Sequence, residues 1–419
     1  MSTTDAAGDL ATLHEHPAEL LRRLVRFDTT NPPGNERACI EFLRDLLAAY
    51  GIESTLLARD PQRPNLIARL PGRGDAPPLL LQGHVDVVTT ERQNWTHPPF
   101  AADIVDGFIW GRGTLDMKGG VAMLVAAFLR ASASQVSLPG DVILCILADE
   151  EAGGDFGARF LIEQHPQLFA GVRYALGEFG GFTHYAGDRR LYPIMVAEKQ
   201  SAAVRATVRG PAGHAAFPLR GGAAARLAAF LQRLDRQRLP VHITPVPRLM
   251  IETLSGLVSP RERLVLRRLL APKLTDRILD LAPPLAAMFD PLLHNTANAT
   301  IIRGGEKNNV IPSEITVDLD VRVLPGYTPQ DALTELRALA GPDVEFELIH
   351  ADTNPATAPD LGLFETLAGA LIAADPEGQP LPYMLAAVTD ARLFTRLGIQ
   401  SYGFLPMRLP PGWDFPRLI

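Results

Sequence analysis

The 419-residue sequence has only two cysteines, Cys39 and Cys145, and these cannot form a disulfide framework. Cys145 lies within the apolar run 142–147 and is expected to be a buried small hydrophobe. The first 20 residues contain no apolar segment of the kind that a signal peptide needs. No apolar run approaches the roughly 18 residues of a membrane-spanning helix. These absences favour a reducing, cytoplasmic compartment and argue against a membrane partner.

An excess of positive charge is also missing. The 40 Lys and Arg residues are outnumbered by 47 Asp and Glu residues, which gives a formal net charge of −7. A nucleic-acid partner would select a basic face, so this balance argues against one. Apolar residues make up 47% of the chain, as in ordinary globular proteins, and 419 residues exceed what one hydrophobic core usually supports. We therefore expect two domains.

Strand-like and helical patterns alternate along the first half of the chain. Apolar runs typical of buried strands occur at Asn65–Leu70, at Leu79–Leu81, at Val142–Ala148 and at Val172–Leu176. Helical patterns lie between or before them, at Glu36–Tyr50, at Val121–Ala131 and at Gly157–Gln164. This alternation predicts an α/β fold with a mostly parallel sheet and helices on both faces.

The pattern changes near Gln200. The segment Ala203–Arg209 alternates apolar and polar residues, as a half-exposed antiparallel strand does. The order of elements from there to residue 353 is β-α-β-β-α-β, which predicts an inserted ferredoxin-like domain over residues 200–353. An extra stretch, about 240–295, is rich in Leu, Arg and Pro and is expected to be helical. Residues 1–199 and 354–419 are therefore predicted to form one domain that the insertion divides.

A histidine and a carboxylate follow the most apolar strand, in Gln82-Gly83-His84-Val85-Asp86. Their spacing puts both side chains on one side of an extended backbone. An aspartate there can accept the second ring N–H of a metal-bound imidazole and fix its tautomer. A loop histidine capped by an aspartate is the alternative interpretation.

More acids follow later strands: Asp116, then Glu150 with Glu151, then Glu178. The intervals are about 30 residues, one strand and one helix each, so these side chains can meet at one edge of a parallel sheet. One histidine and several carboxylates suit zinc or a similar divalent ion, which neutralises the repulsion among the acids. The alternative is that Asp149, Glu150 and Glu151 only form a solvated helix cap.

The motifs occur in a recognisable order: Gly83-His84-Val85-Asp86, Gly111-Arg112-Gly113, Asp116-Met117-Lys118-Gly119-Gly120, Asp149-Glu150-Glu151, Gly177-Glu178 and Gly213-His214. In these motifs the chain resembles the dinuclear zinc exopeptidase-like metallohydrolases, the family of acetylornithine deacetylase, succinyl-diaminopimelate desuccinylase, aminoacylase and carboxypeptidase G. The resemblance covers nearly the whole chain. It implies a zinc-exopeptidase sheet interrupted by a lid and dimerisation domain.

The resemblance also implies a set of metal ligands. His84 and Glu178 would bind one Zn²⁺ ion, Asp116 would bridge two, and Glu151 would bind the second, with Co²⁺ or Mn²⁺ as possible substitutes. The Asp116–Met117 peptide bond corresponds to the position of a cis bond in the family.

Two further roles follow from the same resemblance. Glu150 would act as general base and then as general acid, and Asp86 would orient the imidazole. Two metal ions would lower the pKa of a bridging water and polarise the scissile carbonyl.

The inserted domain is implied to complete the site. His214 would reach the active site of the partner subunit in a homodimer formed through this domain, and would stabilise the oxyanion there. An exposed loop histidine is the alternative. Asn309 and Arg322 would clamp the substrate carboxylate, because the planar guanidinium binds both oxygens. An arginine on an alternating strand is otherwise solvated.

Most histidines outside these motifs are not expected to bind metal. Six lie in polar or proline-rich surroundings and are expected at the surface: His14, His16, His97, His165, His242 and His294. In the family a histidine after the last strand completes the second zinc site, but no histidine follows His350 here. We therefore expect either a sequence that stops short of this ligand or a weak or empty second site.

These features predict a metal-dependent hydrolase, either an amidohydrolase or a metallopeptidase of the carboxypeptidase, deacylase or aminoacylase type. The substrate would be a small carboxylate-bearing amide, such as an N-acyl amino acid or a short peptide. One alternative is an aminopeptidase with the same metal core, which would need an acidic pocket in place of Arg322. Another is a non-catalytic family member with an incomplete second metal site.

Overall fold

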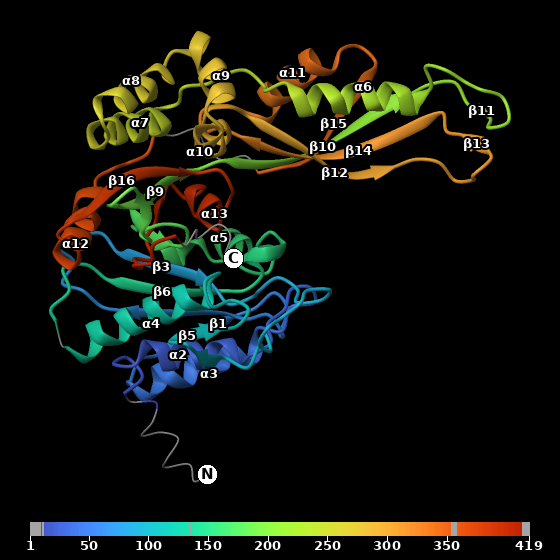
Figure 1. Ribbon diagram of the computed structural model, residues 1–419. Helices are drawn as coiled ribbons and strands as arrows, with labels where there is room; N and C mark the ends of the chain where they lie inside the picture. Colours follow the sequence, from blue (N-terminus) through green and yellow to red (C-terminus); the bar gives the residue numbers. More distant parts are fainter. Residues whose placement is uncertain (1–9, 11, 135, 353–357, 413–419) are drawn as a thin grey trace. The chain divides into compact units, whose positions relative to one another are not determined.

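The computed structural model describes residues 10, 12–134, 136–352 and 358–412, which form two compact units (Figure 1). The first unit comprises Met1–Val196, Asp360–Pro380 and Thr389–Ile419, and the second comprises Ala197–Pro359 and Leu381–Val388. The predicted boundary at 353/354 falls outside the described residues. The segment 381–388, predicted to lie in the metal-binding domain, groups with the second unit, where the Leu385 carbonyl accepts a hydrogen bond from Lys199 N.

A nine-stranded sheet forms the centre of the first unit, with the order β1-β2-β6-β3-β7-β17-β9-β16 and with β8 paired to β9. The strands are β1 (Ser54–Leu57), β2 (Asn65–Leu70), β3 (Leu79–His84), β6 (Val142–Leu147), β7 (Tyr174–Gly177), β8 (His184–Ala186), β9 (Arg189–Glu198), β16 (Gly378–Leu385) and β17 (Gln400–Gly403). The middle strands β6, β3, β7 and β17 run parallel, and β1, β2 and β9 are antiparallel to their neighbours. The predicted α/β class with a mostly parallel sheet is confirmed.

Helices cover both faces of this sheet, and alternate residues of β6 show why. Leu144 and Ile146 pack in the cluster that contains α2 (Pro17–Val25), α3 (Arg37–Ala49) and α4 (Lys118–Ala133). Ile143, Cys145 and Leu147 point to the other cluster, with α5 (Ala158–Gln164) and α13 (Ala391–Thr395). Both cysteines are buried. The other helical segments among the described residues of the unit are α12 (Phe364–Ala374), η1 (Glu150–Ala152) and η2 (Pro166–Phe169).

Helix α4 begins three residues before the predicted start, because its two glycines lie inside the helix. A Cβ atom on Gly119 would stand 2.1 Å from the carbonyl oxygen of Thr114, so close packing requires glycine here. The Asp116–Met117 peptide bond just before the helix is cis, as the resemblance implied.

The second unit contains a four-stranded antiparallel sheet in the order β12-β14-β10-β15, which matches the predicted ferredoxin-like topology. Its strands are β10 (Gln200–Arg209), β12 (Thr296–Arg303), β14 (Glu314–Val323) and β15 (Val344–Ala351), and the short pair is β11 (Gly213–His214) with β13 (Val310–Ile311). Helices α6 (Ala223–Arg236) and α11 (Pro329–Ala340) pack on one face of the sheet. The predicted helical stretch contains α7 (Pro245–Leu257), α8 (Pro260–Arg268), α9 (Pro272–Leu281) and α10 (Pro283–Leu293). Each starts with proline, whose fixed φ suits the first helical position.

Three local features differ from the expectations. Strand β9 contains Pro193, a residue that lowers the strand signal of a sequence, and neither β8 nor β9 was predicted. A hairpin of β4 (Asp103–Val105) and β5 (Phe108–Trp110) was also unforeseen. His294 is buried rather than exposed, and both of its ring nitrogens have partners: Nε2 lies 3.0 Å from Asp276 Oδ1 and Nδ1 lies 2.9 Å from the Asp290 backbone oxygen. Among the described residues, no helix combines the length and the apolar character that crossing a bilayer requires.

Candidate metal centre

Three predicted ligands meet at one edge of the first unit's sheet. His84 ends β3, and Glu178 directly follows the neighbouring parallel strand β7. Asp116 lies in the loop before α4. The His84 Nε2 atom is 3.2 Å from Asp116 Oδ1 and 3.6 Å from Glu178 Oε2, and ligand atoms of all three residues lie within 4.8 Å of one another. Parallel strand ends therefore bring together an imidazole and two carboxylates, as we predicted from their spacing.

The second ring nitrogen of His84 faces Asp86. Its Nδ1 atom lies 3.0 Å from the backbone oxygen of Asp86 and 3.3 Å from Oδ1. The two Asp86 carboxylate oxygens also accept hydrogen bonds from the backbone N–H groups of Glu150 and Glu151, each at 3.1 Å. Burial would raise the pKa of Asp86, but hydrogen bonds from His84, from Asn31 and from the Glu151 N–H lower it below the ordinary value. Asp86 thus joins the imidazole to the segment that carries the proposed base.

Glu150 and Glu151 lie on η1, immediately after β6. The Glu150 Oε1 atom is 3.8 Å from Arg392 Nη1. Burial, followed by the charge of Glu178, raises the pKa of Glu150 well above its usual range. Burial also raises the pKa of Glu151 to about 7. Within the described residues, the cluster of possible ligands does not include Glu151. Its assignment to a second metal ion stays a prediction.

The electrostatics of the cluster fit a divalent cation. Burial alone would lower the pKa of His84, but hydrogen bonds to Asp116, Asp86 and Glu178 raise it well above its ordinary value. Burial, with the charges of Asp116 and Asp390, raises the pKa of Glu178 to about 8. Crowded buried carboxylates of this kind resist ionisation unless a positive charge offsets their repulsion. One imidazole and several carboxylates are also the donors that zinc accepts.

Asp390 adds another buried acid to this region. It follows the strand β16 in Thr389-Asp390-Ala391-Arg392, a segment whose pattern alone indicates no role. Neither of its carboxylate oxygens has a hydrogen-bond partner among the described residues. Burial raises the pKa of Asp390 to about 6.

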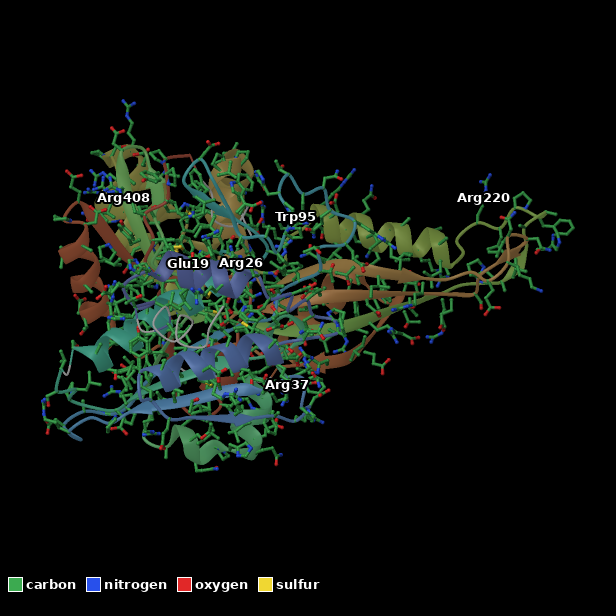
Figure 2. All side chains as sticks on the ribbon, turned by 90° about the horizontal axis from the view of Figure 1, so that it is seen from below. Glu19, Arg26, Arg37, Trp95, Arg220 and Arg408 are labelled. Atoms are coloured by element: carbon green, nitrogen blue, oxygen red, sulfur yellow. The ribbon has the colours of Figure 1, made fainter. Side chains whose placement is uncertain are left out.

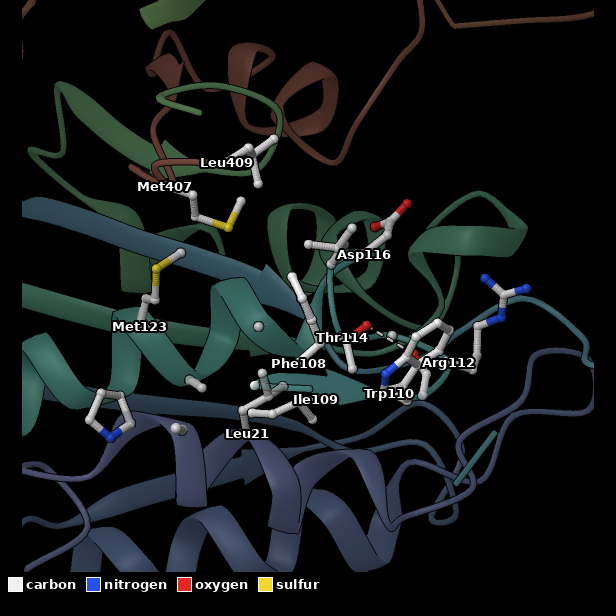
Figure 3. A pocket seen from close by; sticks show the side chains of 18 of the residues that line it. Leu21, Phe108, Ile109, Trp110, Arg112, Thr114, Asp116, Met123, Met407 and Leu409 are labelled. Carbon is white, nitrogen blue, oxygen red and sulfur yellow. Dashed lines mark hydrogen bonds between the residues drawn. The ribbon is translucent and has the colours of Figure 1, made fainter. Parts of the chain in front are cut away.

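An apolar cavity of about 740 Å³ reaches the cluster at Asp116 (Figure 3). Phe108, Trp110 and Met407 contribute to its lining, and Arg112 is one of its two cationic residues. Asp116 is the most accessible member of the cluster, with 24% of its side chain exposed against 1% for His84. The cluster is therefore open on the Asp116 side.

The remaining predicted residues belong to the second unit, and they lie at its two ends. His214 is exposed on β11, which pairs with β13, and the Asn309 carbonyl accepts a hydrogen bond from Ala215 N. Figure 2 shows Arg220 in the same outlying segment. Arg322 lies near the opposite end of β14, where its Nε and Nη2 atoms donate to Asp320 at 2.8 and 2.9 Å.

Within one chain, Asn309 and Arg322 therefore lie apart, and their role as a clamp for the substrate carboxylate stays a prediction. Arg322 lies eight residues beyond Glu314, the start of β14. At about 3.3 Å per strand residue, the separation along the strand is roughly 26 Å. Spacing in the sequence could not show this, because both residues lie close to the same strand.

Sequence reasoning missed three residues around the centre and left the role of a fourth, Arg392, open. Asn31, Glu36 and Arg63 are buried and are linked by hydrogen bonds toward Asp86, and Arg392 contacts Glu150. In the sequence, the Asn31-Pro32-Pro33-Gly34 turn indicates only a helix break. Polar residues of loops and helix ends give no burial signal, because their partners come from distant segments.

Comparison with known proteins identifies the family. The profile of peptidase family M20/M25/M40 matches residues 80–412, which is more than half of the chain. The chain belongs to this family. Succinyl-diaminopimelate desuccinylase of Paracoccus denitrificans is 30% identical over 325 residues, which cover 77% of this chain and 72% of that protein. A Dictyostelium discoideum protein named Probable carboxypeptidase S-like 2 is 27% identical over 366 residues, which cover 81% of this chain. The matched region spans 66% of that relative, slightly less than two thirds of its length.

A solved structure agrees with the family assignment. An M20 family metallo-carboxypeptidase from Sulfolobus solfataricus superimposes with a TM-score of 0.65 at 15% identity, and the match covers 93% of this chain and 90% of that protein. At this identity the likeness concerns the fold. This M20 family member therefore has the family fold together with a largely buried His/Asp/Glu cluster at the edge of its sheet.

Proposed function

We propose that this M20 family hydrolase is metal-dependent and cleaves an amide or peptide bond in a small carboxylate-bearing substrate. The observation that carries the proposal is the convergence of His84, Asp116 and Glu178 within 4.8 Å at one sheet edge. Zinc is the ion that we propose, with cobalt or manganese as substitutes. A divalent ion at such a site supplies Lewis acidity toward the scissile carbonyl and toward the attacking water.

The chain's own residues would handle the protons. Glu150 would accept the proton of the attacking water and return it to the leaving nitrogen. Its raised pKa suits this double role, because burial makes the carboxyl group hold a proton more readily than an ordinary glutamate does. Asp86 would keep the proton of His84 on Nδ1, so that Nε2 faces the cluster. Arg392 would limit the movement of the Glu150 carboxylate.

Arg322 is the best candidate for the substrate carboxylate. Its Nη1 atom is buried and has no hydrogen-bond partner among the described residues, whereas Nε and Nη2 bind Asp320. A free guanidinium N–H favours an anionic substrate group over the free amine that an aminopeptidase binds. An N-acyl amino acid or a short peptide carries such a group. The two relatives are named as a desuccinylase and as a carboxypeptidase S-like protein, and both names fit a substrate of this class.

We further propose a homodimer formed through the second unit. Strand β12 is an edge of its sheet, and Ile301 and Ile302 are 45% and 56% exposed there. An unprotected apolar edge is a template for pairing with another chain. Strand β12 leads directly into the segment with Asn309, so pairing at this edge would place Asn309 and His214 next to the partner. His214 could then donate to an oxyanion in the partner's site.

The test of the function uses Glu150→Gln, with Glu163→Gln as a matched control on the exposed surface of α5. Each protein is loaded with zinc and analysed for metal content and for hydrolysis of N-acyl amino acids and dipeptides. We expect the wild type and the control to hydrolyse at least one substrate, and Glu150→Gln to keep its metal but lose at least about 100-fold in kcat, the lower range of a general base. A metal-loaded wild type that hydrolyses none of the panel would contradict the proposal. Loss of the metal in Glu150→Gln would contradict the role of Glu150.

A further inference from the structure

Buried polar side chains connect the start of α3 to the candidate metal centre, and the proposed mechanism does not use them. They are Glu36, Arg63, Asp149 and Asn31, with exposed fractions of 0, 5, 2 and 5%. All four belong to the first unit. A buried polar group is costly unless it is paired, so a row of four needs an explanation.

Asn31 is the member that touches the centre. Its side-chain amide donates to Asp86 Oδ2 at 2.8 Å and to Asp149 Oδ1 at 3.1 Å. Both acceptors are carboxylates, which fixes the amide with its nitrogen toward them. The Asn31 backbone N–H donates to the Val87 carbonyl at 2.8 Å. The amide is therefore held at a fixed place beside the segment that carries Asp86.

Arg63 contacts the same Asp149 oxygen that accepts the hydrogen bond from Asn31. The Arg63 Nη1 atom lies 2.9 Å from Asp149 Oδ1, and Nη2 donates to Glu36 Oε1 at 2.6 Å. The guanidinium also lies over the ring of Phe156, with its carbon 4.9 Å from the ring centroid. Arg63 thus neutralises Asp149, and Asp149 in turn limits where the Asn31 amide can lie.

Each carboxylate oxygen of Asp86 makes more than one polar contact. It faces His84 Nδ1 and accepts the backbone N–H groups of Glu150 and Glu151. A carboxylate that rotated about its χ2 bond would lose one of these contacts. The hydrogen bond from Asn31 to Oδ2 opposes that rotation, and a charged acceptor makes such a bond strong.

We infer that Asn31 is a positioning residue for the metal centre, acting through Asp86 on His84 and on the Glu150-Glu151 segment. The inference rests on the proposed function, because it assumes that His84 binds a metal ion. Asn31 touches neither the ligand nitrogen of His84 nor the carboxylate of Glu150. Its effect is to keep the carboxylate of Asp86 in the one orientation that serves both.

The decisive variant is Asn31→Asp, which replaces the donor with a third carboxylate between Asp86 and Asp149. Asn31→Ser is the milder form: it adds no charge, and its shorter side chain cannot bridge both acids. The matched control is Asn295→Asp in the second unit. Asn295 is 1% exposed, and its amide donates to Glu335 Oε2 at 2.9 Å, so the same substitution again places two buried carboxylates together.

Each full-length protein is stripped of metal and titrated with Co²⁺ by calorimetry, and the visible spectrum of bound Co²⁺ is recorded. Removing a residue that orients a metal ligand typically weakens metal binding by about 10- to 100-fold, and we expect this for Asn31→Asp, with a smaller loss for Asn31→Ser. The Co²⁺ spectrum should change in both variants, and kcat should fall more than KM rises. Asn295→Asp should bind Co²⁺ as the wild type does.

The outcomes separate the two proposals. If Asn31→Ser and Asn31→Asp bind Co²⁺ with wild-type affinity and spectrum, the positioning role of Asn31 is wrong, whatever the enzyme hydrolyses. If Asn295→Asp loses as much Co²⁺ affinity as Asn31→Asp does, the effect is general destabilisation and the inference is also overturned. Should Asn31→Asp fail to fold, Asn31→Ser decides by the same criteria. A wild type that binds Co²⁺ tightly but hydrolyses no substrate contradicts the proposed function. The ratio of the Co²⁺ affinities of the wild type and the Asn31 variants still tests the role of Asn31 in that case.

Discussion

Replacing Arg63 with methionine should destabilise the first unit severely. Methionine keeps most of the side-chain length and apolar contact but leaves Glu36 and Asp149 without their cation. Glu36 is fully buried, with 0% of its side chain exposed, and Asp149 retains only 3%. Breaking a buried ion pair by removing one partner costs about 3–5 kcal/mol, because the remaining charge stays uncompensated. We expect a loss of unfolding free energy within that range.

The loss should also depend on pH, and the sign follows from Glu36. Burial already raises the pKa of Glu36 above the ordinary value, despite the lowering effect of Arg63. Without the arginine that pKa rises further, so folding favours the protonated form. A group whose pKa is raised in the folded state stabilises below its unfolded pKa, and this stabilisation is lost as the pH rises through the folded pKa. Arg63→Met should therefore be closer to the wild type at pH 5 than at pH 8.

Urea unfolding followed by tryptophan fluorescence measures this effect, since Trp95 and Trp110 both lie in the first unit. The matched control is Arg44→Met on α3, whose partner Asp45 is exposed, because such surface pairs contribute only about 0–1 kcal/mol. The double variant Arg63→Met/Glu36→Gln should recover part of the loss by removing one unpaired charge. A cost below about 1 kcal/mol for Arg63→Met, equal to that of the control, would refute the reasoning that these buried acids depend on the guanidinium.

The other predictions concern the second unit. Lys199 is fully buried between the His294 carbonyl and Thr296, and burial lowers its pKa to about 7. Because the unfolded lysine holds its proton to about pH 10.4, the stability of this unit should rise between pH 7 and pH 10, and Lys199→Met should weaken this rise in unfolding measurements. A slope that is the same in both proteins would show that Lys199 is not its source. Ile302→Lys should dissociate the proposed dimer in sedimentation experiments, whereas Ile349→Lys on the opposite edge strand β15 should not. Unchanged dimers with Ile302→Lys, or a monomeric wild type, would contradict the β12 interface.

The sequence was informative wherever a residue follows a buried strand. His84 and Glu178 could be placed together because both come directly after apolar runs, and neighbouring parallel strands end at the same edge of a sheet. The inserted topology was also predictable, since the alternation of β10 and β14 is regular. These are local signals, because they need only the periodicity of apolar and polar residues and the order of the elements along the chain.

Contacts between distant loops left no such signal. Asn31 is 55 residues from Asp86 and 118 from Asp149, and nothing local marks it as their shared donor. Arg63 was likewise one arginine among many, although it is among the most buried charges of the unit. A buried polar network depends on which loops pack against each other, and this is set by the whole fold rather than by any one segment.

The two ends of the second unit impose a final constraint on the proposed mechanism. His214 and Asn309 lie at one end of β14 and Arg322 near the other, roughly 26 Å apart by the rise of a β-strand. A side chain of ordinary length bridges only a fraction of this distance. The ligand atoms of His84, Asp116 and Glu178 lie within 4.8 Å of one another, so the cluster is small compared with the separation of the two ends. If both ends take part in the reaction, the second must come from another copy. The separation within β14 thus supports the proposed homodimer, in which activity would depend on the β12 interface as well as on the proposed metal ligands.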